Sequence, residues 1–196
     1  MAISKGNDKF FSRPGLWSLF LICALPLHIW TFILAFRDFS WVTERTNSWD
    51  ALGVVSYGLI FTFFESIAVF ITSVFLGLFI SRKWDEKKRL AVSVVLITII
   101  SIWAMVNHLY FLNGAPALQN VITFFTKFDH PLRALYVGSF LLVTPTFLFP
   151  VYFVFRSEVF FRIVQYLVER LSVLMSLYLV VDLAALAIIL IRNLRG

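Results

Sequence analysis

The chain has 196 residues, of which 60% are hydrophobic and 14% are charged, and its formal net charge at pH 7 is +6. Its single cysteine, Cys23, excludes an internal disulfide framework, a thiolate metal site and a CxxC redox pair. The basic balance does not indicate a nucleic-acid partner, because most Lys and Arg residues lie beside long apolar stretches, where they orient a membrane protein and meet anionic lipid.

Five apolar stretches predict five membrane spans in a single transmembrane domain, because a bilayer needs about 20 apolar residues per helical crossing. In chain order the predicted spans cover residues 16–36, 51–80, 90–111, 135–155 and 172–191. The first follows a basic run and is too long for the apolar part of a signal peptide, so we interpret it as an uncleaved span. Prolines 26, 145 and 150 are expected to bend the first and fourth spans. The predicted fold class is all-α: a polytopic integral membrane protein, built as a five-helix transmembrane bundle with short amphipathic surface helices.

Two connecting segments are predicted to be amphipathic. Residues 117–128, between the third and fourth spans, place apolar and polar side chains on different helical faces and predict a short surface helix. Residues 156–171 form either a cytoplasmic surface helix or the first half of one long helix that includes the fifth span. That long helix would measure about 51 Å, so part of it would lie outside a hydrocarbon core about 30 Å thick.

The distribution of Lys and Arg predicts the orientation. The amino-terminal tail, the 81–89 loop and the 156–171 segment together hold eleven of these residues, and the segments on the other side hold six. The positive-inside rule therefore predicts a cytoplasmic amino terminus and an external carboxyl terminus, in the cell (plasma) membrane. Arg192 and Arg195 count against this arrangement of the final crossing.

The candidate site is a group of polar residues inside the spans. Glu65 lies near the middle of the second span and Asp182 near the middle of the fifth, where a carboxylate costs roughly 2.5–3.5 kcal/mol. The full candidate set is Glu65, Asp182, His28, His108, Asn107 and Thr62. No predicted span contains Lys or Arg, so a protonated histidine is the one intramembrane cation that the chain can supply.

These polar residues are expected to face the interior of the bundle, because an unsatisfied polar group facing lipid costs several kcal/mol. The residues expected to be buried are Gly58, Thr62, Glu65, His28, Thr98, Ser101, His108 and Asp182. The residues expected to face lipid or a partner are Phe63, Phe70 and Phe75. Each carboxyl group could be a neutral, hydrogen-bonded structural element, and Glu65 could also contact another membrane subunit or transfer protons.

No cofactor, metal site or catalytic residue is predicted. A bis-histidine haem would need His28 and His108 at similar depth, but their span positions separate them by about 7 Å along the membrane normal. A metal site from His108, Asp129 and His130 has suitable ligands, although nothing in their spacing selects it. No P-loop, GxSxG, HExxH or GxGxxG pattern occurs in the chain.

The sequence favours a non-enzymatic function: a small integral subunit or accessory protein that acts through helix–helix and lipid contacts. Its expected partners are membrane lipids and either another membrane protein or a second copy of the chain, and not nucleic acid. The first alternative is a small transporter or a proton- or ion-conducting protein that uses Glu65. The second alternative is a membrane enzyme acting on a lipid-linked substrate, for which Asp38, Glu44, Asp129 and His130 would have to converge.

Overall fold

The computed structural model describes residues 12–78, 84–112 and 116–195 of the chain. These residues form six α-helices and no strand. The helices are α1 (Arg13–Arg45), α2 (Ser48–Gly77), α3 (Glu86–Leu112), α4 (Pro116–Phe125), α5 (Pro131–Arg156) and α6 (Glu158–Arg195). All except α4 are long and apolar enough to cross a membrane. The predicted fold class, an all-α membrane bundle with five potential spans, is confirmed.

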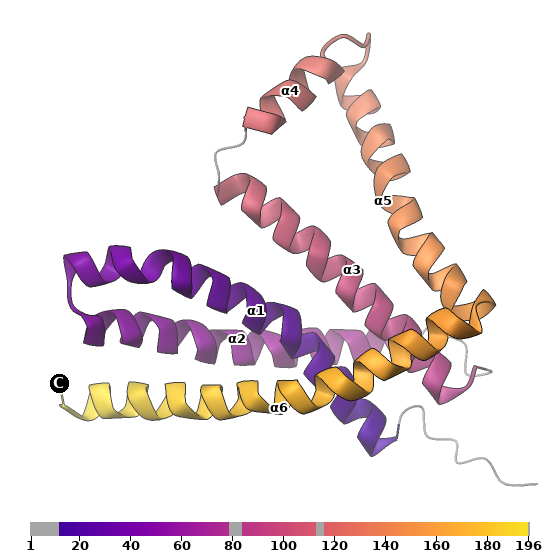
Figure 1. Cartoon of the computed structure of the whole chain (residues 1–196). Coiled ribbons are helices and arrows are strands. Elements are labelled where there is room, and N and C mark those ends of the chain that lie inside the picture. Colours follow the sequence, from indigo (N-terminus) through magenta and orange to yellow (C-terminus); the bar gives the residue numbers. More distant parts are fainter. Residues whose placement is uncertain (1–11, 79–83, 113–115, 196) are drawn as a thin grey trace, which may run out of the picture.

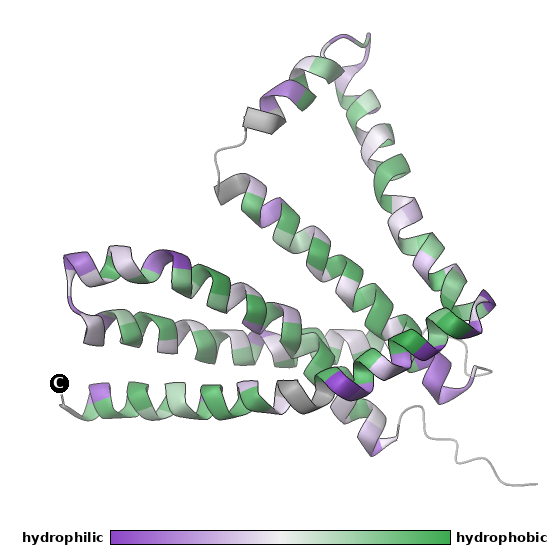
Figure 2. Ribbon diagram, viewed as in Figure 1, coloured by the Kyte–Doolittle hydropathy of each residue, from purple (hydrophilic) through white to green (hydrophobic). Residues whose placement is uncertain are grey.

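The first two helices form a hairpin with a very short turn. Ser12 caps α1 by accepting a hydrogen bond from the Gly15 backbone N–H, at 3.2 Å. Asn47 caps α2 in the same way by accepting from the Asp50 backbone N–H, at 2.9 Å. Because α1 continues to Arg45, it extends nine residues beyond the predicted end of the first span. These additional turns carry the more hydrophilic residues at the end of the hairpin (Figure 2).

The prolines that were expected to bend the first and fourth spans lie inside continuous helices. In α5, the Thr146 hydroxyl donates to the Val143 carbonyl oxygen at 2.6 Å, directly after Pro145. The same hydroxyl accepts a hydrogen bond from the Trp103 indole N–H at 3.0 Å, which joins α5 to α3. The Thr146 hydroxyl thus has a hydrogen-bond partner on its own helix and one on α3.

The sequence left two possibilities for residues 156–171, and the structure has one long helix. After Ser157, α6 runs without interruption for 38 residues, about 57 Å at the usual rise of an α-helix. Its first half crosses the region where α1 and α3 meet, and its second half runs beside α1 and α2 (Figure 1). The predicted short helix near residues 117–128 is also present, as α4, and it packs on α5.

The five long helices meet at one end and diverge at the other. Helices α1, α2 and α6 remain together along most of their length, whereas α3 and α5 separate from them and from each other (Figure 1). Helix α4 follows α3 and joins the far end of α5. The apolar core lies where the helices meet, and the residues buried in it include Leu19, Ile22, Val92, Val154 and Val164.

Candidate functional site

A buried histidine–aspartate pair joins α1 to α6. His28 is 1% exposed and Asp182 is 5% exposed. The Nε2 atom of His28 lies 3.1 Å from each carboxyl oxygen of Asp182. The Nδ1 atom of His28 lies 2.8 Å from the carbonyl oxygen of Ala24, one turn earlier on α1. Both ring nitrogens of His28 therefore have hydrogen-bond partners within the chain.

The geometry of the pair determines how many protons it holds. A carbonyl oxygen only accepts hydrogen bonds, so Nδ1 of His28 must carry a hydrogen that it donates to Ala24. One further proton must then lie between Nε2 and Asp182, because an unprotonated nitrogen and a carboxylate would repel each other. The pair is therefore electrically neutral as a whole. Equal distances from Nε2 to the two oxygens favour an imidazolium N–H shared by both oxygens of a carboxylate.

Further polar contacts surround this pair and connect the same three helices. Tyr178, one turn before Asp182 on α6, stacks on the His28 ring with centroids 5.1 Å apart. One turn further along α1, the hydroxyl oxygens of Thr31 and the buried Thr62 lie 2.6 Å apart and join α1 to α2. These contacts hold α1, α2 and α6 together where the other long helices diverge.

Glu65 does not join this polar cluster. Its side chain is exposed, and no hydrogen bond or ion pair connects its carboxyl group to any other residue that the structure describes. The expectation that Glu65 is buried is wrong. The reason is its position on the helix: α2 packs through Leu59, Thr62 and Ser66, and Glu65 precedes Ser66 by one residue, which rotates it by about 100° around the helix.

Some of the other predictions about burial are confirmed and others are wrong. Burial is confirmed for His28, Thr62 and Asp182. It is wrong for Thr98 and His108, which are exposed, while Gly58 and Ser101 are partly buried. Among the phenylalanines expected to face lipid, Phe75 is exposed and Phe63 and Phe70 are partly buried. Thr98 satisfies its hydroxyl by donating to the Val94 carbonyl at 2.8 Å, and the exposed Asn107 donates to the Trp103 carbonyl at 2.9 Å.

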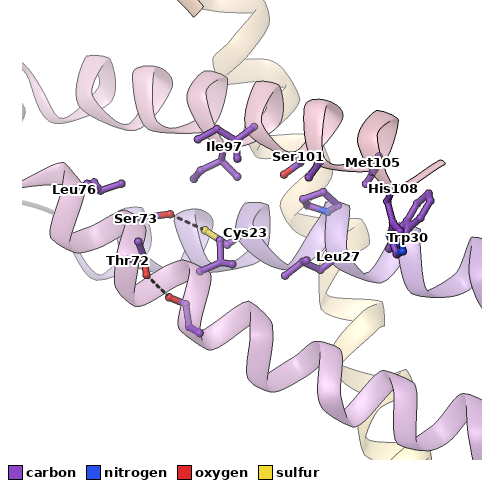
Figure 3. A pocket seen from close by; sticks show the side chains of 15 residues that line it. Cys23, Leu27, Trp30, Thr72, Ser73, Leu76, Ile97, Ser101, Met105 and His108 are labelled. Carbon is purple, nitrogen blue, oxygen red and sulfur yellow. Dashed lines mark hydrogen bonds between the residues drawn. The ribbon is translucent and has the colours of Figure 1, made fainter. Parts of the chain in front are cut away.

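A groove with a volume of about 460 Å³ lies between α2 and α3, with α1 along its base (Figure 3). Most of its lining is apolar, and the polar side chains in it are Thr72, Ser73, Ser101 and His108. The Cys23 thiol at the base lies 3.7 Å from the Ser73 hydroxyl. At the other end of the groove, the His108 ring lies against Trp30 with centroids 5.0 Å apart.

Glu65 lies on the α2 face that lines this groove. It precedes Ala68 by three residues and Thr72 by seven, which places all three on one side of an α-helix, and Ala68 and Thr72 line the groove. The Thr31–Thr62 and Cys23–Ser73 contacts give the antiparallel register of α1 and α2. In that register, Glu65 is level with the turn of α1 that holds Trp30. Glu65 therefore lies about one turn of α2 beyond the groove-lining Ala68, toward the Trp30–His108 end of the groove, and it is not itself one of the lining residues.

The sequence-predicted site residues thus form two groups rather than one pocket. His28, Asp182 and Thr62 belong to the buried cluster. His108 lines the groove, Asn107 is its neighbour in the chain, and Glu65 lies on the groove-facing side of α2 without lining the groove itself. Over the described residues, no three metal-binding side chains come close enough together to hold a metal ion, so His108, Asp129 and His130 are not assembled into a site. For a haem, neither ring nitrogen of His28 is left to bind the iron.

A contact between the end of α6 and the start of α2 was not expected from sequence. The Arg192 guanidinium donates to Asp50 at 2.7 Å and to the Trp49 carbonyl oxygen, so the last turns of α6 are fastened to the first turn of α2. Arg192, one of the two arginines that counted against the final crossing, is therefore paired with Asp50. The acidic residues proposed for an enzyme site do not converge: Asp38 pairs with neighbouring Arg37 at the end of α1, and Asp129 lies in the turn before α5.

Comparison of the chain with protein-family models, with curated proteins and with solved structures finds no match. Function is therefore inferred from the geometry of these two groups of residues.

Proposed function

We propose that this chain is a small integral membrane subunit that binds a second membrane protein along the groove between α2 and α3. The observation that carries the proposal is the exposed, unpaired Glu65 in the middle of an apolar helix. A carboxylate at this depth costs roughly 2.5–3.5 kcal/mol when nothing compensates it. A partner that covers the α2–α3 groove and satisfies the carboxyl group removes that cost.

The shape of the chain supports the same proposal. Helix α5 buries only Val154 among its described residues, and α3 separates from α1 and α2 beyond the core. Hydrophobic residues predominate along the diverging helices, which suits contact with lipid or with another apolar protein surface (Figure 2). The additional polar groups of the groove distinguish it from a surface made for lipid alone.

The proposed location is the cell membrane, with the amino terminus in the cytoplasm and the carboxyl terminus outside. The support is the excess of Lys and Arg in the amino-terminal tail, the 81–89 loop and the 156–171 segment, together with the alternation of helix ends. The start of α1, the end of α2, the start of α3 and the α5–α6 turn lie toward one end of the molecule, whereas the α1–α2 turn and the end of α6 lie toward the other (Figure 1).

Site-specific photocrosslinking in native membranes tests the proposed subunit function. A photoreactive phenylalanine at Ile100, in the groove, is expected to give a discrete protein adduct, and Glu65→Gln is expected to abolish it. The matched control is the same probe at Phe140, an exposed position on α5 outside this groove. Adducts that are absent at Ile100, or identical at both positions, would contradict the proposal.

Proton or ion conduction is the second candidate function, supported by the His28–Asp182 pair as a proton-holding site in an apolar setting. Its test is proton flux in proteoliposomes with Asp182→Asn, which keeps the shape and removes the ionisable group. Unchanged flux would exclude a role of the pair in conduction. We favour the subunit function because Glu65, the central residue of the conduction hypothesis, does not contact the pair.

A further inference from the structure

We propose that the occupant of the groove is a membrane-spanning helix of a different protein, with a Lys or Arg side chain near its midpoint that pairs with Glu65. The inference rests on the proposed subunit function and specifies the chemistry of its partner. Its basis is the juxtaposition of an uncompensated carboxyl group with a groove of about 460 Å³ at the same face of α2.

Charge complementarity identifies the cation. An acidic group in hydrocarbon is stabilised most by a positive group within direct contact, and intramembrane acidic and basic residues commonly pair with one another. The chain has no Lys or Arg in any predicted span, so a second copy of it cannot present such a group at this depth. His28 is buried and engaged with Asp182. His108 lies against Trp30, and a histidine is a cation only when it is protonated, whereas Lys and Arg carry their charge throughout the neutral pH range. A permanent cation for Glu65 would therefore come from a different protein.

The dimensions of the groove identify the occupant as a helix. Its α3 wall runs from Ile97 to His108 and its α2 wall from Ala68 to Leu76. These walls correspond to about 16 Å and about 12 Å of helix, which is two to three turns of a helix lying alongside. Small side chains such as Ala68 and Ala104 in the walls permit close backbone approach, and the hydroxyls of Thr72 and Ser101 offer hydrogen bonds.

A lipid fits these features less well. An acyl chain would fill the apolar part of the groove, but it offers nothing to a carboxyl group or to hydroxyls. The cationic groups of lipid headgroups stay at the membrane interface, roughly 15 Å from the midplane of a hydrocarbon core about 30 Å thick. Glu65 lies near the middle of α2, out of their reach.

The test uses the full chain reconstituted in phosphatidylcholine vesicles and three synthetic probe peptides. Each probe is a membrane-spanning polyleucine helix carrying a fluorescence acceptor, with a central Lys, Gln or Leu. Energy transfer from the tryptophans of the protein reports binding. The central-Lys probe is expected to bind about tenfold tighter than the central-Leu probe, because a single relieved charge at the midplane is worth more than 1.4 kcal/mol.

Two variants test whether binding of the central-Lys probe depends on a carboxyl group at the position of Glu65, and not merely on a carboxyl group at that depth. Glu65→Gln is expected to lower binding of the central-Lys probe to the level of the central-Leu probe. The matched control combines Glu65→Gln with Phe64→Glu, which keeps a carboxyl group at the same depth but rotates it about 100° away from the groove. Phe64 is exposed, and it is turned about 100° further than Glu65 from the middle of the α2 face that lines the groove, so the rotated carboxyl group is expected not to restore binding. Far-UV circular dichroism checks that both variants remain folded.

The outcomes separate this inference from the subunit function. Equal binding of the central-Lys and central-Leu probes by the wild type would overturn the inference that the partner helix carries a basic residue. Restored binding by the variant with Phe64→Glu would overturn the inference that this helix binds in the groove. In either case, a Glu65-dependent photoadduct at Ile100 would still support the subunit function, with a partner that offers a hydrogen bond instead of a charge. Tight, Glu65-dependent binding of the central-Gln probe would indicate such a hydrogen-bonded partner and would also overturn the inference that Glu65 pairs with a Lys or Arg side chain.

Discussion

The His28–Asp182 pair is expected to be the strongest single polar contribution to the stability of the bundle. The two side chains are almost fully buried, and Nε2 of His28 contacts both carboxyl oxygens at 3.1 Å. Removing one member of a buried ion pair leaves an uncompensated charge and costs about 3–5 kcal/mol. We therefore expect His28→Ala and Asp182→Ala each to destabilise the protein by about 3 kcal/mol or more.

The double variant provides the sharper measurement. Once one partner is absent, removal of the other relieves an uncompensated charge, so the two losses are expected to fall short of additivity by about 2 kcal/mol. Neutral hydrogen bonds between membrane helices couple by about 0.6 kcal/mol on average and about 1.7 kcal/mol at most. A coupling energy above that maximum identifies an ion pair, whereas a lower value identifies a neutral carboxyl group hydrogen-bonded to His28.

Asp182→Asn is the matched control for Asp182→Ala, because asparagine keeps the shape of the side chain and removes the ionisable group. Because Nδ1 of His28 keeps its hydrogen on the Ala24 carbonyl, a neutral His28 has a free acceptor at Nε2, to which the Asn amide can donate. We expect Asp182→Asn to cost about 1 kcal/mol, which is well below the cost of Asp182→Ala.

The assay is reversible unfolding in mixed micelles with increasing SDS, followed by far-UV circular dichroism and tryptophan fluorescence. Additive single and double variants, or an Asp182→Asn variant as damaging as Asp182→Ala, would refute the contact between the two side chains.

Three further predictions concern other contacts. Trp103→Phe removes the indole donor to Thr146 and is expected to cost about 1 kcal/mol in the same unfolding assay, whereas an unchanged midpoint would mean that α3 and α5 are not joined there. Arg192→Gln removes a partly exposed ion pair with Asp50 and is expected to cost no more than about 1 kcal/mol, with a smaller effect in high salt. A cysteine introduced by Lys88→Cys, in a background without the native cysteine, is expected to react with membrane-impermeant maleimide only after the membrane is opened; labelling of intact cells would reverse the proposed orientation.

The long apolar stretches were enough to predict the helical class and the number of potential spans. Span length has a direct physical cause, because backbone groups in hydrocarbon must be satisfied within the helix and the hydrocarbon has a fixed thickness. The cost of exposing a polar group to lipid also correctly predicted that the side chains of Asp182 and His28 are buried. It did not predict that they contact each other, since residues 154 positions apart meet only through the packing of α1 against α6.

The sequence by itself determined which residues share a helical face, and the tertiary structure decided which face is packed. Glu65, Ala68 and Thr72 lie on one side of α2, as helical periodicity requires. The neighbouring face with Thr62 and Ser66 is the one that packs inside the bundle, which leaves Glu65 exposed on the groove-facing side of α2. Periodicity fixes the angle between two side chains on a helix, but the rotation of the whole helix depends on the combined packing of α1, α2 and α6, which no single segment encodes.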